Sequence, residues 1–186
     1  MDVECPLEEC FQPRRVAQSL CLVSTTLAWS ASAVARRAAN SAMSIPAKLR
    51  QEVIAAASAR CEYCQTSSRI TGTPLVMEHI LPKSLGGSDE RDNLAASCYR
   101  CNEFKGVKTH ARDPESGQLV ALFNPRQQRW VDEFAWSNGG THVIGKTATG
   151  RATVIGLRLN NDQLVEAQAL WIAFRWHPPS ARSLEP

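Results

Sequence analysis

The chain has 186 residues, of which 44% are hydrophobic and 21% are charged. This length suits one domain with extensions and allows a packed core, and the composition excludes collagen, coiled coils and repeat arrays. The net charge of +3 arises entirely in residues 43–112, which hold ten basic and seven acidic side chains. This excess is either a chance surplus or a weak sign of an anionic partner.

Residues 1–42 are rich in Ala, Ser and Cys. An apolar run at 16–35 is interrupted by polar side chains and is too polar for a membrane span. The preceding Arg14-Arg15 pair faintly resembles a signal peptide, but the acidic start of the chain argues against secretion. We expect a disordered or upstream extension, with Met43 as a candidate natural start, in a cytoplasmic protein without membrane contact. A secreted protein is the alternative.

Residues 43–112 show helix and strand patterns in turn. Apolar side chains at helical spacing predict a helix over 47–60. The apolar run at 73–81, which prolines bracket, predicts a strand, and residues 94–97 predict a short return strand. A helix over 99–105 is expected to end at the glycine that follows it.

Residues 113–186 have a different character. Asn138-Gly139-Gly140 is a strong turn signal and predicts a hairpin over 134–144. Residues 152–159 alternate enough to predict another strand, and either Asn161 or Asn160 is placed to cap a last helix. Four of the five tryptophans lie in this part, so we expect it to pack a core.

Four of the seven cysteines form two C-x-x-C pairs, Cys61 with Cys64 and Cys98 with Cys101. Two such turns can direct four thiolates at one ion, and a tetrahedral zinc site closed by four sulfurs leaves no position for water. The expected role is therefore structural. The odd cysteine count argues against a full disulfide framework, while two disulfides or a redox-active pair remain the alternatives.

Four polar residues lie in register with these pairs: Glu78, His79, Asn93 and Asn102. Over about residues 58–109 the sequence resembles the HNH endonuclease family, in the subgroup with four zinc-binding cysteines and an asparagine as the last motif residue. The family pattern has an acidic residue and a histidine on the first strand, an asparagine about fourteen residues on, and a histidine or asparagine about nine residues later. The resemblance implies an α+β fold with a ββα-metal (His-Me finger) core, a structural four-cysteine zinc site and a mixed strand and helix C-terminal extension.

The resemblance also implies an endonuclease that hydrolyses DNA phosphodiester bonds with a single divalent ion. His79 would be the general base. Glu78 and Asn102 would give oxygen ligands to Mg²⁺ or Mn²⁺, and Asn93 would fix the hairpin loop and orient the His79 ring. Aspartate is the more common residue before the histidine, so the longer Glu78 would place the ion slightly differently.

Each of these residues also has an ordinary explanation when taken singly. His79 could be a half-buried histidine, Asn93 a turn residue and Asn102 a polar residue at a helix start. Their common register between the cysteine pairs favours the nuclease. The competing function is a non-catalytic zinc module that binds nucleic acid or protein, which would need the cysteines but not the four polar residues.

Basic residues near the motif could hold phosphates on either side of the cut. They are Lys83, Arg100, Lys105 and Lys108. Solvated surface charge is the alternative for each of them. The expected partner is DNA, with RNA as a further option, and the expected state is a monomer or a homodimer. We expect a nuclease domain at 43–112 and a C-terminal α+β extension at 113–186 that packs on it.

Overall fold

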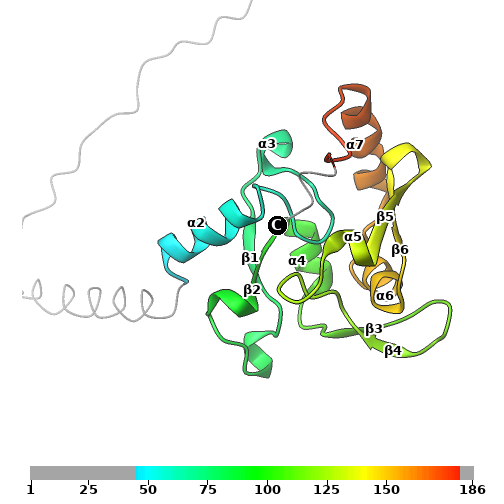
Figure 1. Ribbon diagram of the computed structural model, residues 1–186. Helices are drawn as coiled ribbons and strands as arrows, with labels where there is room; N and C mark the ends of the chain where they lie inside the picture. The colour runs from blue at the N-terminus through cyan, green and yellow to red at the C-terminus, as the bar shows by residue number, and fades with distance from the viewer. Residues whose placement is uncertain (1–44, 181–186) are drawn as a thin grey trace, which may run out of the picture. The chain divides into compact units, whose positions relative to one another are not determined.

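The computed structural model describes residues 45–180. The predictions for residues 1–42 and the candidate start at Met43 lie outside these described residues. Helices and short antiparallel strand pairs alternate along the described part (Figure 1), which confirms the predicted α+β class. None of the helices in this part is long and apolar enough to cross a membrane.

The helix α2 covers Ala47–Ala56 and ends earlier than predicted. Ser58 and Ala59, just beyond it, have positive φ angles of 52° and 57°. Residues in this left-handed region cannot continue an α-helix, so the chain turns here into the loop that carries the first C-x-x-C pair. The short helix α3, Ser68–Thr71, follows that loop.

An antiparallel hairpin and a helix stand at the centre of the described unit. Strand β1, Val76–His79, pairs with β2, Leu94–Ser97, and the second strand is buried along its whole length. Helix α4, Tyr99–Lys105, packs against both strands and ends at Gly106, as predicted. These three elements form the ββα unit that the sequence resemblance implies.

The connection between β1 and β2 folds back closely on itself. It contains two 3₁₀ turns, Lys83–Leu85 and Arg91–Asn93. A Cβ atom added at Gly87 would lie 1.8 Å from the carbonyl oxygen of Leu81. Only glycine permits this approach of two backbone segments, and the approach keeps the connection compact beside the hairpin.

The second half of the described chain adds two strand pairs and three helices. Their bounds are β3 His110–Arg112, β4 Leu119–Ala121, α5 Trp130–Glu133, β5 Phe134–Ser137, β6 His142–Gly145, α6 Ala148–Gly156 and α7 Asp162–Ala173. The β5–β6 hairpin turns at Asn138-Gly139-Gly140, as predicted. Helix α7 begins after Asn161, whose side chain accepts a hydrogen bond from the Leu164 amide at 3.1 Å, so the predicted cap is confirmed. Figure 1 shows the β5–β6 hairpin, α6 and α7 on the side of the unit away from α2.

The strand predicted over residues 152–159 is wrong, because helix α6 occupies most of this segment. The alternation of side chains along this segment favoured a strand. A helix forms instead because the Thr147 hydroxyl caps its start, accepting from the Gly150 amide at 3.0 Å. A Cβ atom at Gly150 would lie 2.2 Å from the Glu133 carbonyl oxygen, so glycine lets the helix start pack against α5.

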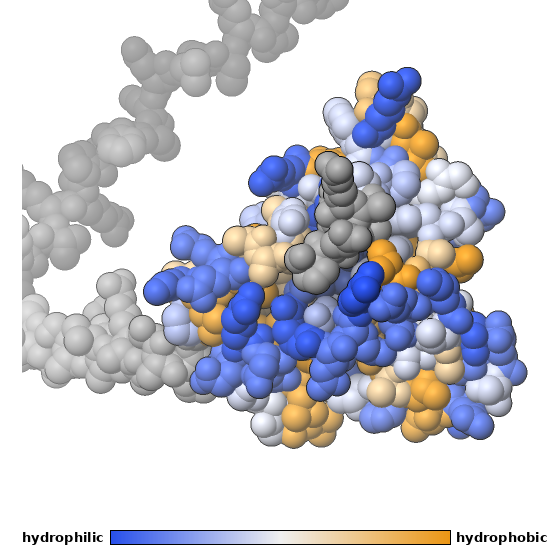
Figure 2. Space-filling model, viewed as in Figure 1, coloured by the Kyte–Doolittle hydropathy of each residue, from blue (hydrophilic) through white to orange (hydrophobic). Residues whose placement is uncertain are grey.

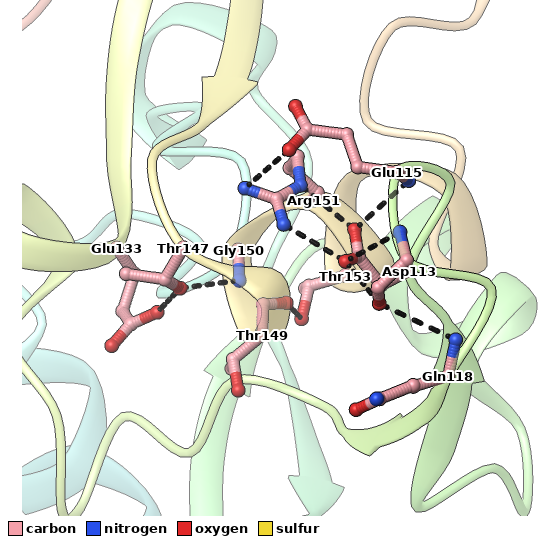
Figure 3. A network of polar contacts seen from close by, with 10 residues as sticks. Asp113, Glu115, Gln118, Glu133, Thr147, Thr149, Gly150, Arg151 and Thr153 are labelled. Atoms are coloured by element: carbon pink, nitrogen blue, oxygen red, sulfur yellow. Dashed lines mark hydrogen bonds and ion pairs between the residues drawn. The ribbon is translucent and has the colours of Figure 1, made fainter.

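A buried ion pair joins the β3–β4 turn to α6 (Figure 3). Arg151 donates from Nε and Nη2 to the two carboxylate oxygens of Asp113, at 2.7 and 2.8 Å. The Ser116 hydroxyl donates to the same carboxylate at 2.7 Å. The hydrogen bonds from Arg151 hold the pKa of Asp113 well below its usual range, so the pair stays charged and fixes the hairpin on the helix.

An aromatic core links the first C-x-x-C loop to the second half of the chain. Tyr63 is fully buried and meets Phe123 edge to face, with ring centroids 6.3 Å apart. Phe123 meets Phe134 in the same way at 5.1 Å. Trp130 donates from Nε1 to the Tyr63 carbonyl at 2.8 Å.

The outer face drawn in Figure 2 is mostly hydrophilic, with hydrophobic side chains interspersed.

Candidate active site and metal centre

The four paired cysteines meet in one cluster. Their Sγ atoms all lie within 4.8 Å of one another, and all four thiols are free of disulfides. The Sγ atoms of Cys64 and Cys98 are 3.7 Å apart. A tetrahedral ion with Zn–S bonds of about 2.3 Å needs sulfurs about 3.8 Å apart. The cluster therefore has the donors and the spacing to hold a metal such as zinc.

Local structure places each cysteine pair. The Gln65 amide donates a hydrogen bond to the Cys61 carbonyl at 2.9 Å, which closes a tight turn around the first pair. Cys98 is the N-cap of α4, and its Sγ accepts from the Cys101 amide at 3.5 Å. A thiolate at a helix start is stabilised by the amides it faces. Hydrogen bonds from the other three thiols, Cys101 first, hold the pKa of Cys98 well below its usual range.

Glu62, inside the first pair, attaches the cluster to the hairpin. Its Oε2 accepts from the Ala96 amide of β2 at 2.7 Å, and its own amide donates to the Ala96 carbonyl at 2.9 Å. Its Oε1 forms an ion pair with Arg126 from the second half of the chain. Burial raises the pKa of Glu62, and the charge of Arg126 opposes that rise. The residue thus covers the edge of β2 and ties three segments together.

Glu78 and His79 end strand β1. In the register of the hairpin, Glu78 lies opposite Ala95 and His79 opposite Leu94. Glu78 is only 5% exposed, whereas His79 is half-buried. Burial raises the pKa of the Glu78 carboxyl, while the hydrogen bond and charge of Lys105 counteract this rise.

Lys105, on α4, is buried against these two residues. Its side chain is 2% exposed, and its ammonium donates to Glu78 Oε1 at 2.6 Å and to the His79 carbonyl at 2.8 Å. The expected phosphate contact of Lys105 does not fit this position, because the ammonium faces the protein interior. The lysine neutralises the buried carboxylate instead.

Asp89 is a residue of this site that the sequence reading did not single out. Its Oδ1 lies 2.7 Å from Nε2 of His79, and its Oδ2 accepts from the Lys83 ammonium at 2.5 Å. Both hydrogen bonds, that of Lys83 first, lower the pKa of Asp89. In the sequence, Asp89 is only an acidic residue directly after Gly86-Gly87-Ser88. Its contact with His79 forms because the connection between β1 and β2 folds back.

Asn93 holds the connection between the two strands closed. Its Oδ1 accepts from the Leu81 amide at 2.8 Å, and its Nδ2 donates to the carbonyls of Leu81 and Ser88 at 3.0 and 2.9 Å. Its backbone carbonyl accepts from the Ile80 amide at 2.9 Å. The segment after His79 is therefore fixed at both ends.

Glu78, His79 and Asn102 line one surface cavity of about 320 Å³, together with Lys83 and the first residues after α4. Asn93 is not part of this lining. The cavity thus combines a carboxylate, an amide and an imidazole. Carboxylate and amide oxygens suit a hard divalent cation such as Mg²⁺, so the donor set fits the ion that the resemblance implies.

The other basic residues expected near the cut lie in different surroundings. Arg100 is half-buried and donates to Asn161 and Gln163 at the start of α7, the latter at 2.7 Å. Its guanidinium links the second cysteine pair to the last helix. Lys108 is exposed and donates to the Phe104 carbonyl at 2.7 Å.

Sequence comparisons with known proteins match part of the chain. Residues 61–108 match the sequence model of the HNH endonuclease family. The chain is 38% identical over 123 residues to the CRISPR-associated endonuclease Cas9 of Corynebacterium diphtheriae, an alignment that covers 61% of this chain and 11% of that protein. The chain thus spans about a tenth of the length of this relative. No solved structure matches significantly. Over residues 61–108 this chain is thus similar to the HNH endonuclease family.

Proposed function

We propose that the chain is a metal-dependent endonuclease that hydrolyses DNA phosphodiester bonds, with His79 as the general base. The observation that carries this proposal is the cavity shared by Glu78, His79 and Asn102. The family match, and the printed name of the relative as an endonuclease, support the reaction class. The domain organisation that we propose is a nuclease domain at 43–112 with an α+β extension at 113–186.

Asp89 would set the tautomer of the neutral His79 ring. An ionised carboxylate can only accept hydrogen bonds, so Nε2 of a neutral His79 carries the ring proton when it bonds to Asp89. Nδ1 is then the basic nitrogen, and it would take the proton of the water that attacks phosphorus. Lys83, on the other carboxylate oxygen, favours the ionised Asp89 that this arrangement requires.

Glu78 and Asn102 would hold Mg²⁺ or Mn²⁺ on the cavity wall. When bound, the ion would supply positive charge for the phosphate and the leaving oxygen. Lys105 occupies Oε1 of Glu78, so Oε2 is the carboxylate oxygen left for the ion. Lys105 also limits the negative charge that the buried carboxylate carries before an ion binds.

The cysteine cluster would hold Zn²⁺ with a structural role. Four thiolates complete a tetrahedral shell, so no position remains for water or substrate. The cluster ties the loop after α2 to the start of α4. The zinc would therefore stabilise the unit on which Glu78, His79 and Asn102 are placed.

Two exposed lysines are proposed as phosphate contacts. Lys83 lines the cavity, and Lys108 lies just beyond α4. Lysines bind phosphates as point charges and give affinity without reading sequence. DNA is the proposed substrate.

The test is nicking of supercoiled plasmid in Mg²⁺ or Mn²⁺ by the full chain and by His79→Ala. The variant should lose at least about a hundredfold in rate, because it lacks the base. The matched control is His110→Ala, which removes an exposed histidine of β3 and should cut like the parent. Zinc content is measured in all three proteins to show that the fold is intact.

Two results would count against the proposal. Equal cutting by the parent and His79→Ala would exclude His79 as the base. DNA binding by the parent without any cutting in either ion would favour the non-catalytic zinc module.

A further inference from the structure

A second cavity lies away from His79, between α3 and the chain that follows α7. It measures about 390 Å³ and has five lining residues: Arg60, Ser67, Arg69, Ile70 and Trp176. Figure 1 shows α3 and α7 at the same end of the described unit. A cavity of this size falls in the range of sites that hold a small molecule or a nucleotide.

Two arginines of this cavity have no acidic partner among the residues that the structure describes. Arg60 is half-buried and donates from Nη1 to the Gln65 carbonyl at 3.2 Å, while Arg69 is exposed. Burial, and then the charge of Arg69, lower the pKa of Arg60. Two neighbouring guanidinium groups without a carboxylate form a site of uncompensated positive charge, which suits a phosphate.

Aromatic rings stand beside these arginines. Trp176 is 54% exposed and stacks on Phe174, which is 66% exposed, with ring centroids 5.2 Å apart and planes at 27°. The next residue, His177, is buried and contacts the Trp136 ring edge to face at 4.5 Å. Its Nε2 lies 3.0 Å from the Gly140 carbonyl oxygen. The exposed pair is therefore held on a fixed support instead of on a free chain end.

We propose that this surface binds single-stranded nucleic acid, with a phosphate at Arg60 and Arg69 and a nucleobase stacked on Trp176. Exposed bases stack on aromatic rings, while arginines hold the backbone. Duplex DNA keeps its bases stacked inside, so it offers only phosphates to such a surface. An acidic peptide would use the arginines but not the stacked aromatic pair. The site is separate from the proposed nuclease centre and does not depend on its activity.

The experiment measures binding of labelled strands to the full chain by fluorescence anisotropy, without added Mg²⁺. The probes are oligothymidylate as DNA, oligouridylate as RNA and an abasic DNA strand of the same length, so that loss of the base is tested apart from the change from DNA to RNA. Trp176→Ala should weaken binding to both base-bearing strands about tenfold and leave abasic binding unchanged. Arg69→Gln should weaken binding to all three strands and lower the salt dependence by about one phosphate contact.

The matched controls change an exposed hydrophobic side chain and an exposed arginine that lie outside this cavity. Leu170→Ala removes a side chain that is 66% exposed on α7, and Arg129→Gln removes an exposed arginine that is paired with Asp132. Neither should change affinity, while Trp176→Phe should retain most of it because stacking survives.

The proposal is overturned if the parent binds abasic and base-bearing strands equally, if Trp176→Ala has no effect, or if an acidic peptide competes as well as oligothymidylate. A preference for oligothymidylate over oligouridylate, or the reverse, assigns the strand to DNA or RNA. Plasmid nicking by the same variants reports the nuclease centre independently, so failure of one proposal does not decide the other.

Discussion

At the scale of single residues, Glu78 and Lys105 form a buried ion pair inside the proposed ion site. We expect Lys105→Met to destabilise the fold by roughly 3 kcal/mol, because it leaves an uncompensated buried carboxylate. Mg²⁺ or Mn²⁺ should restore part of this loss by taking over the charge on Glu78. Thermal unfolding with and without the ion measures both effects.

The matched control for this change is Lys108→Met, which removes an exposed lysine just beyond the end of α4. It should alter stability by less than about 0.5 kcal/mol and should not increase the response to the ion. If the divalent ion stabilises the parent and Lys105→Met equally, the lysine and the ion do not share Glu78.

A second residue-scale expectation concerns Asp89 as a positioning residue. Asp89→Asn should lower the single-turnover cleavage rate about tenfold to a hundredfold, because the amide no longer fixes the proton on Nε2 of His79. The KM for DNA should stay near that of the parent, since in the proposed role the carboxylate acts through His79 and not on the substrate. Glu90→Gln, an exposed neighbour in the same connection, is the control. A rise in KM at unchanged rate would show that Asp89 acts in binding.

At the scale of elements, the cysteine cluster brings the loop after α2 together with the start of α4. Cys101→Ser opens the shell by one thiolate, so we expect loss of the metal and of the cooperative thermal transition. Atomic absorption measures the metal content, and far-ultraviolet circular dichroism during heating measures the thermal transition. Ser97→Ala, which changes a neighbouring hydroxyl 4.0 Å from the Sγ of Cys61, should keep the metal. A folded Cys101→Ser protein without metal would show that the cluster does not hold the unit together.

Elements were predictable where their signals are local. Gly106 after α4, the turn at Asn138-Gly139-Gly140 and the Asn161 cap each depend on a few adjacent residues, and the structure confirms them. The strand prediction over residues 152–159 was wrong because it rested on alternation within the segment, while the helix depends on a cap and a close glycine contact that precede the segment. Short strands such as β3 carry too few residues for a periodic signal.

The candidate site was predictable where its residues follow a local pattern along the chain, and not where it depends on contacts between separate segments. Fixed spacing along the chain drew attention to Glu78, His79 and Asn102, which the fold brings to one cavity. This spacing does not show which side chains from other segments contact these residues. The contact of Asp89 with His79 and the burial of Lys105 depend on how separate segments pack, so only the structure revealed them.

At the scale of the whole molecule, the second half of the chain packs onto the ββα unit through buried polar contacts as well as aromatic rings. Trp130 bonds the Tyr63 carbonyl, Arg126 pairs with Glu62, and Arg100 bonds the start of α7. Each contact joins residues more than sixty positions apart. Such long-range contacts are made only on folding, so we expect the two halves to unfold together in a single transition.

His177 makes the stability of this assembly depend on pH. Burial lowers the pKa of His177 from its ordinary value of 6.5 to about 4. Between these two pKa values the unfolded chain binds a proton at His177 that the folded chain does not bind. The free energy of unfolding is therefore highest above about pH 6.5 and falls as the pH drops toward 4. A shift of this size corresponds to a loss of roughly 3 kcal/mol at the low end. His177→Gln keeps an N–H donor for the Gly140 carbonyl but does not titrate, so it should lose less stability over this range than the parent does.

The measurement is urea unfolding of both proteins from pH 7 to pH 4, compared as the difference in free energy of unfolding. Taking the difference removes effects that the two proteins share, such as protonation of the cysteines or of Asp113. His110→Gln, which changes an exposed histidine, should follow the parent at every pH. If His177→Gln and the parent lose stability in parallel, His177 is protonated in the folded state and the buried ring does not set the acid limit of the fold.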